Sequence, residues 1–243
     1  MFSIASLVVI ASLLVSQAAA HGSVTSYVIG LTTFAGSQPY SFASGHSSIE
    51  RPYSIILAVT DQTVRCNNNG QPSSGQLSAT VVAGTSITAK WSQWTQSQGP
   101  VIVYMANCNK VRSSVNSNTL KWLKIAQTGL ISGKLGKKPG RHPARRGTGI
   151  VVDTLAYTST IPAALAPGDY LIRHQLLAIH QANTPQSYPE CAQLTVTGSG
   201  KGFPSGSFLT MFPGTYRWDL SASDPSININ IYDATTAACL APV

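Results

Sequence analysis

Short apolar and β-branched runs, separated by glycine- and proline-containing turns, make up most of the chain. Turn signals recur about every 8 to 15 residues, and no long stretch has the spacing of an amphipathic helix. Examples of such runs, which we interpret as strands, are Ser54 to Thr60, Gln76 to Val82, Ser86 to Trp91, Val101 to Ala106, Gly149 to Tyr157, Tyr170 to Ile179, Gln193 to Thr197 and Ile227 to Tyr232. This pattern is typical of an all-β sandwich, so we expect two packed antiparallel sheets and less than about a fifth of the residues in helices.

The first twenty residues differ from the rest. An apolar core runs from Ile4 to Val15, and the small residues Ala18-Ala19-Ala20 follow it. These features indicate a signal peptide over residues 1–20, although a basic start is missing. The apolar run is shorter than the about 20 residues of a membrane span. We therefore expect a secreted protein without a membrane segment, a new amino terminus at His21, and a single domain over residues 21–243 without a C-terminal carbohydrate-binding module.

Charge is sparse and unevenly placed. Charged residues make up 10% of the chain and the net charge is +8, which excludes charge-driven disorder. Six of the 16 basic residues lie between Gly133 and Gly147. That segment is interpreted as a solvated loop, as a patch that binds polyanions, or as an inserted segment foreign to the mature protein. It has no interleaved aromatic residues, and we expect no nucleic-acid partner.

The cysteines and the new amino terminus carry the candidate chemistry. The four cysteines, Cys66, Cys108, Cys191 and Cys239, are expected to form two disulfides after secretion, with three possible pairings. A terminal histidine offers an α-amine and an imidazole that can chelate one metal ion. Nitrogen donors of this kind suit copper(II).

A series of motifs extends over nearly the whole chain after residue 20. They are HGSVTSYVIG at 21–30, FAGSQPY at 34–40, IERPYSI at 49–55, VRCNNNG at 64–70, WSQWTQSQGPVIVYMANC at 91–108, LKWLKI at 120–125, IPAALAPGDYLIRHQLLAIH at 161–180, QSYPECAQLTVTG at 186–198 and FPGTY at 212–216. Together they resemble the fungal lytic polysaccharide monooxygenases of auxiliary activity family nine. The block from Pro167 to Leu194 is the most specific part, and the basic segment lies outside the resemblance.

The resemblance implies a fold and an activity. The fold is an immunoglobulin-like or fibronectin-III-like antiparallel β-sandwich with long loops and a flat, exposed copper site. One copper ion per chain is held by a histidine brace, which consists of the terminal amine and imidazole of the first histidine and the imidazole of a second. After reduction by an external electron donor, copper reacts with dioxygen or hydrogen peroxide, and cellulose or another β-glucan is oxidised at carbon 1 or carbon 4. A monomer is expected.

The same resemblance assigns roles to residues. His21 matches the first histidine of the brace, and Tyr188 matches the axial tyrosine. Gln186 and His180 match the outer-sphere glutamine and histidine near the oxygen species. Residues i and i+2 of a strand share a face, so Gln186 and Tyr188 can point to one site. Only six positions separate His180 from Gln186, fewer than is usual in the family. We expect these four residues to converge at the surface, with Ser97 or Gln98 beside them.

Two positions depart from the family pattern. The second brace histidine normally stands two residues before the glycine of a Gly-Pro pair. Here that pair is Gly99-Pro100, and Ser97 occupies the ligand position. The local string is also one residue shorter than in the family. A serine hydroxyl is a poor copper ligand at neutral pH, so the copper affinity is left open. The other departure is Gln175, where the family commonly has glutamate.

The resemblance also pairs Cys66 with Cys191, which leaves Cys108 for Cys239. His174 is expected to be structural, and His46 and His142 are expected in exposed polar loops. Candidate aromatic residues for substrate contact are Tyr27, Phe34, Tyr40 and Tyr216, several of which suit the core equally well.

Three functions compete on this evidence. The first is a secreted copper monooxygenase that acts on cellulose or a related β-glucan. The second is a non-catalytic relative that binds polysaccharide, or binds copper weakly, because of Ser97. The third is a structural cell-wall protein that binds anionic polymers through its basic segment. The substrate and the site of oxidation stay open.

Overall fold

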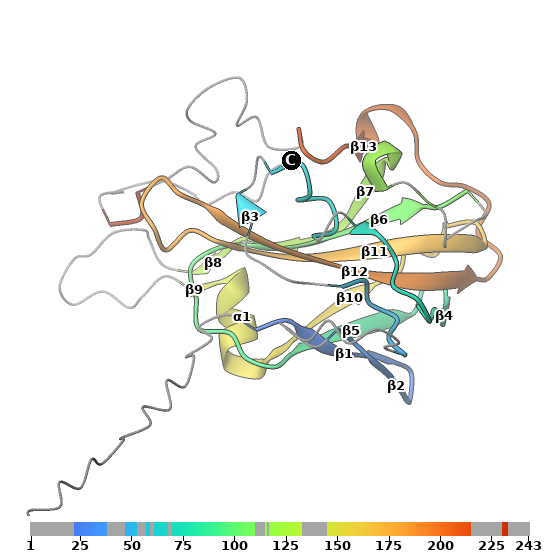
Figure 1. Ribbon diagram of the computed structural model, residues 1–243, viewed down its shortest axis with the longest axis horizontal. Helices are drawn as coiled ribbons and strands as arrows, with labels where there is room; N and C mark the ends of the chain where they lie inside the picture. Colours follow the sequence, from blue (N-terminus) through green and yellow to red (C-terminus); the bar gives the residue numbers. More distant parts are fainter. Residues whose placement is uncertain are drawn as a thin grey trace, which may run out of the picture.

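Two β-sheets pack face to face and enclose the main hydrophobic core (Figure 1). The computed structural model describes residues 22–37, 47–52, 57–58, 61–67, 70–109, 115, 117–132, 145–214 and 230–232. The smaller sheet has the strand order β10-β5-β1-β2, and the larger has the order β13-β7-β6-β11-β12-β3, with β4 also paired to β12. Strands β8 and β9 form a separate ladder. The expected β-sandwich is therefore confirmed.

The strands have the following bounds. They are β1 Val24–Ile29, β2 Thr32–Ala35, β3 Leu57–Ala58, β4 Ala79–Val82, β5 Ser86–Trp91, β6 Val101–Asn107, β7 Trp122–Thr128, β8 Leu130–Ser132, β9 Arg145–Arg146, β10 Ala156–Thr160, β11 Gly168–Ala178, β12 Gln186–Thr197 and β13 Leu209–Thr210. Among the described residues there is one α-helix, α1 at Gly147–Thr154, and there are the short 3-10 turns Ser117–Thr119 and Gly206–Phe208. All strand pairs are antiparallel except the parallel pair β4–β12.

Burial along the strands explains why they form. Strand β4 alternates buried and exposed side chains, and so does most of β5, because one face meets the core and the other meets solvent. Strands β6, β11 and β12 are instead buried over almost their full length. A second apolar cluster, which includes Ile102, Tyr104, Leu171 and Phe212, covers the outer face of the larger sheet. Both faces of its central strands are thus shielded from water.

One predicted strand is wrong over most of its length. The range Gly149 to Tyr157 begins inside helix α1, and only its last two residues belong to β10. A short run of β-branched residues does not by itself distinguish a buried strand from a buried helical turn. Here the backbone N–H of Thr148 donates to the carbonyl of Gly99 at 3.0 Å, and Val151 is fully buried. These tertiary contacts select the helix.

Other predicted boundaries also change. Strand β1 was not among the predicted ranges, and the predicted strand at Gln193 to Thr197 starts seven residues earlier, at Gln186. The described end of the range Ile227 to Tyr232 is a turn. In the basic segment, residues 133–144 lie outside the described residues. Its end is ordered into β9 and the start of α1, so the interpretation as a loop does not extend to residue 147.

A disulfide and a buried arginine fix the 61–67 loop against the larger sheet. Cys66 is bonded to Cys191 of β12, the pairing that the family resemblance implies. Arg173 donates from Nε and Nη2 to the carbonyls of Arg65 and Val64, at 2.6 and 2.8 Å. Its guanidinium also lies 4.0 Å from the centre of the Phe212 ring. Cys108 is buried, and its expected partner Cys239 lies outside the described residues.

Gln175 provides a test of this buried network. Its Oε1 accepts from Arg173 Nη1 at 2.6 Å, and its Nε2 donates to Ser187 Oγ at 2.7 Å. In Gln175→Glu, both contacts persist, because the Ser187 hydroxyl can donate to the carboxylate, and the bond to Arg173 becomes charge-assisted. We expect the free energy of unfolding at pH 7 to rise by about 1 kcal/mol, as measured by thermal unfolding. The control Gln175→Leu should lower it by about 1–3 kcal/mol, since both partners lose a bond. A Gln175→Glu variant less stable than the natural chain would contradict this account.

Candidate functional site

Strands β11 and β12 end together and present three of the expected site residues. Ala178, the last residue of β11, pairs with Gln186, the first residue of β12. His180 follows β11 by two residues, and Tyr188 lies two residues into β12. The seven residues between these strands therefore return the chain to the same end of the larger sheet. The structure thus brings His180, Gln186 and Tyr188 to one end of the sandwich.

The Tyr188 side chain is buried and held on two sides. Its hydroxyl donates to Gln186 Oε1 at 2.9 Å, and Gln186 Nε2 donates to Gln181 Oε1 at 3.2 Å. The Trp94 ring packs edge-on against the phenol, with ring centres 4.8 Å apart. The Trp94 indole donates to the carbonyl of Gln96 at 2.6 Å. The phenol therefore has a fixed position, and a hydrogen-bonded amide lies beside it.

The segment from Ser92 to Gln98 joins this group from the smaller sheet. The backbone N–H of Ile179 donates to the carbonyl of Gln98 at 3.0 Å. Gly99 has φ +142°, and a Cβ there would lie 1.7 Å from the carbonyl oxygen of Leu177. Only glycine permits this close approach. The Gly-Pro pair thus fixes Ser97 and Gln98 next to the end of β11.

The start of the described chain lies against the same segment. A Cβ on Gly22 would lie 2.2 Å from the carbonyl oxygen of Gln93, so only glycine fits there. The N–H of Ser92 donates to the carbonyl of Ser23 at 3.0 Å. His21 itself lies outside the described residues. Its covalent neighbour Gly22 is therefore packed against the segment that carries Trp94 and Ser97, at the same end as Tyr188.

His180 is partly buried, and burial lowers the pKa of its imidazole below the usual 6.5. The ring is therefore neutral at neutral pH and can accept as well as donate a hydrogen bond. The hydroxyl of Tyr232 donates to the backbone carbonyl of His180 at 2.9 Å, and the Tyr232 side chain is exposed. Sequence reasoning did not select Tyr232 or Trp94. Tyr232 places an exposed aromatic ring beside the site.

Ser97, which the family resemblance puts at the position of the second brace histidine, contacts its neighbour Gln98. Ser97 Oγ donates to Gln98 Oε1 at 3.1 Å, so the two side chains contact each other. Across from Ser97 lies Gly149 of helix α1, and a Cβ there would be 4.0 Å from the Ser97 Cβ. Within the described residues, no group of three or more His, Cys, Asp or Glu side chains could hold a metal ion. The described side chains at this end are thus the phenol of Tyr188, the imidazole of His180, the amides of Gln186 and Gln98 and the hydroxyl of Ser97.

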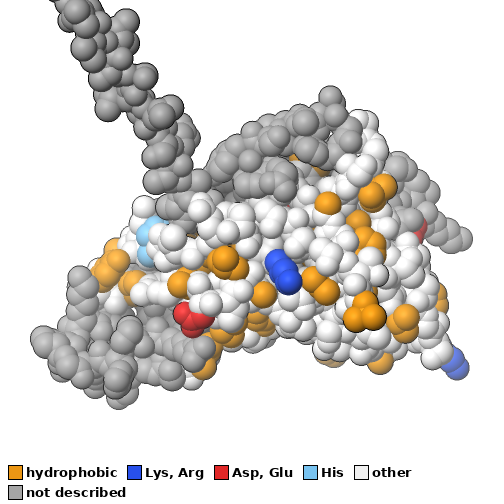
Figure 2. Space-filling view, turned by 90° about the horizontal axis from the view of Figure 1, so that it is seen from below, with side chains coloured by type: hydrophobic (Ala, Val, Ile, Leu, Met, Phe, Trp, Pro, Cys, Tyr) orange, Lys and Arg blue, Asp and Glu red, His pale blue; other side chains and the backbone are white. Residues whose placement is uncertain are grey.

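Several other candidates have different surroundings. Tyr27 is fully buried, so of the two alternatives for this residue, substrate contact or core, the structure selects the core. Phe34 is partly buried and packs against the main core. Tyr40, Tyr216, His46 and His142 lie outside the described residues. The face formed by the smaller sheet carries few charged side chains, and its hydrophobic side chains are scattered rather than gathered in one patch (Figure 2).

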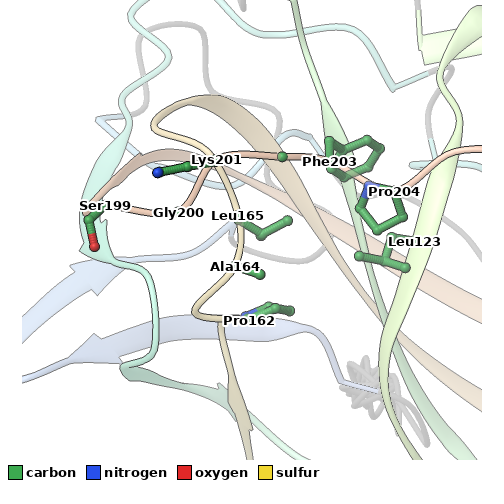
Figure 3. A pocket seen from close by; sticks show the side chains of 10 residues that line it. Leu123, Pro162, Ala164, Leu165, Ser199, Gly200, Lys201, Phe203 and Pro204 are labelled. Atoms are coloured by element: carbon green, nitrogen blue, oxygen red, sulfur yellow. The ribbon is translucent and has the colours of Figure 1, made fainter.

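A separate hollow of about 650 Å³ lies beyond the other end of β12 (Figure 3). It is lined mainly by Leu123, Pro162, Leu165, Phe203 and Pro204. Strand β12 has 12 residues, and at about 3.3 Å per residue its two ends lie roughly 35 Å apart. This hollow is therefore remote from Tyr188, and its lining offers no cluster of titratable groups.

His174 is structural, as expected. It is fully buried, and its ring contacts Tyr27 and Trp91, with ring centres 5.6 and 6.3 Å apart. Neither ring nitrogen has a hydrogen-bond partner among the described residues. Burial lowers the pKa of His174 to about 3. The folded protein therefore keeps this imidazole neutral over the pH range in which an unfolded chain would protonate it.

This shift predicts a pH-dependent loss of stability. The pKa of His174 is lower in the folded protein than in the unfolded chain. Its contribution to the free energy of unfolding is therefore fully present above about pH 6.5 and is lost as the pH falls towards 3. In His174→Leu this loss is absent. We expect the free energy of unfolding of the natural chain to fall by about 2 kcal/mol relative to His174→Leu between pH 6.5 and pH 5. Chemical denaturation of both proteins at the two pH values measures the difference, and a constant difference would show that His174 is protonated in the folded protein.

Comparison with known proteins identifies the family. The model of Auxiliary Activity family 9 (formerly GH61) matches residues 21–238. The chain is 44% identical over 230 residues to AA9 family lytic polysaccharide monooxygenase B of Heterobasidion irregulare (strain TC 32-1), across 93% of this chain and 90% of that protein. It is 42% identical over 226 residues to AA9 family lytic polysaccharide monooxygenase-like protein CEL1 of Agaricus bisporus, across 90% and 67% of the two chains.

Solved structures agree. The crystal structure of HiLPMO9B superposes with a TM-score of 0.78 at 43% identity, covering 87% of this chain and 92% of that chain. A cellulose-active polysaccharide monooxygenase from M. thermophila, MtPMO3*, superposes with a TM-score of 0.77 at 37% identity, covering 88% and 92%. The chain belongs to auxiliary activity family 9. Its named relatives are lytic polysaccharide monooxygenases, which are copper oxidoreductases. No helix among the described residues is long and apolar enough to cross a membrane.

Proposed function

We propose that the chain, processed to begin at His21, is a secreted copper-dependent monooxygenase that cleaves cellulose or a related β-glucan oxidatively at carbon 1 or carbon 4. The observation that carries this proposal is the convergence of Gly22, Trp94, His180, Gln186 and Tyr188 at one end of the sandwich. Family membership and the cellulose-active relative support the reaction class and the substrate.

Each residue of the site has its own role in this proposal. The amine and imidazole of His21 would hold copper as a chelate, and the buried phenol of Tyr188 would be a further oxygen donor. When bound, copper supplies one-electron chemistry that activates dioxygen or hydrogen peroxide. Trp94 and the Gln186 amide fix the position of the phenol. The neutral imidazole of His180 can donate a hydrogen bond to an oxygen ligand or accept one from water.

Substrate would lie across this end of the sandwich, where it would meet exposed groups. Tyr232 offers an exposed aromatic ring tied to the backbone of His180. Aromatic rings present apolar faces that suit the C–H faces of a sugar chain.

Processing at His21 gives the first test of the copper site. A chain with one extra glycine before His21 has an amide where the mature chain has an amine, so the chelate is lost. We expect its Cu(II) affinity to be at least about 10-fold lower than that of the mature chain, because nitrogen donors dominate Cu(II) binding. Competition with a chromophoric chelator measures both affinities, and unfolding temperatures of the metal-free proteins serve as the control. Equal affinities would contradict the role of the amine, and release of oxidised sugars by the extended chain would contradict the proposed function.

A further inference from the structure

Two buried carboxyl groups connect the amino-terminal hairpin to β12. Glu190 Oε2 accepts from the backbone N–H of Val24 at 2.6 Å, and Glu50 Oε2 accepts from the backbone N–H of Ser37 at 2.8 Å. Both glutamates are 1% exposed. Val24 starts β1, and Ser37 lies two residues beyond the end of β2. The two carboxyl groups therefore bind the two backbone strands at the open end of one hairpin.

Among the described residues, no strand of the smaller sheet pairs with β12, and the backbone connection runs through Ile49, whose N–H donates to the carbonyl of Ala35 and whose carbonyl accepts from the N–H of Gln193. Strands β1 and β2 belong to the smaller sheet and β12 belongs to the larger one. Glu50 is bridged to Ala192, so both glutamates are anchored on β12 or directly beside it. A Cβ on Gly36 would lie 2.7 Å from Glu50 Oε2, which shows how closely the hairpin backbone approaches the carboxyl group. The pair thus forms a polar link between the two sheets.

The surroundings of the Glu50 and Glu190 carboxyl groups favour their neutral, protonated form. Burial raises the pKa of Glu190 to about 7 and raises that of Glu50 well above its usual value, and the neighbouring carboxyl group adds to the rise for Glu50. The Tyr27, Trp91 and His174 side chains belong to the same buried region. A carboxyl group keeps an acceptor oxygen for a backbone N–H in either protonation state.

We propose that Glu190, supported by Glu50, is a positioning residue that sets the amino-terminal segment in place against the strand of Tyr188. Val24 lies three residues after His21, and Glu190 lies two residues after Tyr188. Because residues i and i+2 of a strand share a face, the face of β12 that presents the phenol also binds the amino-terminal strand. The Glu190 carboxyl group therefore relates the start of β1, three residues after His21, to the strand that carries Tyr188. Only the effect of Glu190 on copper binding rests on the proposed function.

Three variants separate this role from general stability. Glu190→Leu removes the acceptor, and Glu190→Gln keeps one. Gln193→Leu is the matched control: it lies on the opposite face of β12, and its side chain bonds Arg51 and the carbonyl of Leu77 but not the amino-terminal hairpin. If Glu190→Leu does not fold, Glu190→Ser, too short to reach Val24, replaces it.

Amide hydrogen exchange of the metal-free protein decides whether Glu190 fixes the segment. We expect the Val24 amide to exchange about 10-fold faster in Glu190→Leu, because its buried N–H loses its acceptor, and to change little in Glu190→Gln and Gln193→Leu. Equal Val24 exchange in Glu190→Leu and Gln193→Leu would overturn the proposal, whatever the copper result.

Copper binding decides whether that position matters for the site. We expect the Cu(II) affinity of Glu190→Leu to fall about 10-fold or more and its electron paramagnetic resonance parameters to change, while Glu190→Gln and Gln193→Leu keep both. An unchanged affinity and spectrum in folded Glu190→Leu would overturn the positioning role. A natural chain that binds no copper would instead refute the proposed function, and the exchange result would still stand as the test of the link between the sheets.

Discussion

Replacing Ser97 by histidine should raise the Cu(II) affinity of the mature chain by at least about 100-fold. Outer-shell partners of a metal site already change affinity by about 10–100-fold, and a lost nitrogen ligand should cost at least the upper end of that range. Ser97 is only partly buried, and its neighbour Gly149 adds no side chain next to it. Chelator competition measures the affinity, and nitrogen hyperfine splitting in the copper spectrum reports the added imidazole.

Two controls make the Ser97 result specific. Gln98→His tests the alternative register, because the string before Gly99-Pro100 is one residue shorter than the family pattern and Gln98 directly contacts Ser97. Ser86→His adds an imidazole at the far end of β5, where the side chain is exposed, and should leave the affinity unchanged. Tight binding by the natural chain that Ser97→His does not alter would show that another residue completes the site.

Loss of the Cys66–Cys191 disulfide should cause the largest loss of stability. The bond joins positions 125 residues apart, and the chain-entropy model assigns about 5 kcal/mol to a loop of that size. For a domain of this size, a loss of this magnitude lowers the unfolding temperature by roughly 10–20 °C. The double variant Cys66→Ala with Cys191→Ala, followed by differential scanning calorimetry, tests the expectation.

A packing control separates the cross-link from the side chains that form it. Val64 is fully buried in the same cluster as Cys66 and Cys191, so Val64→Ala truncates that cluster without opening the loop. We expect the disulfide variant to lose clearly more stability than Val64→Ala. Equal losses would indicate that the bond adds nothing beyond packing.

The sequence predicted a strand correctly where its hydrophobic pattern matches the burial of that strand in the fold. The range Val101 to Ala106 falls within β6, and Tyr170 to Ile179 lies in β11 except for its last residue, since continuous apolar runs bounded by turn signals suit strands buried on both faces. It failed at Gly149 to Tyr157, where the same kind of run folds as helix α1 because Thr148 bonds the carbonyl of Gly99. The deciding partner lies about 50 residues away, so no local pattern could report it.

The candidate site likewise contains residues that the sequence predicted and residues that it did not. Gln186 and Tyr188 were predicted together from i, i+2 geometry and the family motif, and they form a direct hydrogen bond. Glu50 and Glu190 were not singled out, because their partners are backbone N–H groups at Ser37 and Val24, and a backbone group leaves no sequence signal. The sequence left the role of Tyr27 open because aromatic residues suit a binding face and a core equally well, and the fold buries it.

Soluble oxidised sugars are the most direct readout of the proposed function. Copper-loaded mature protein is incubated with cellulose and a reductant, and the released oligosaccharides are analysed by mass spectrometry beside those from Ser97→His. We predict oligosaccharides oxidised at carbon 1 or carbon 4, few from the natural chain and more from Ser97→His, with none when copper or the reductant is omitted. If both copper-loaded chains bind cellulose and release no oxidised product, the chain is a non-catalytic binding relative, and the proposed function is wrong.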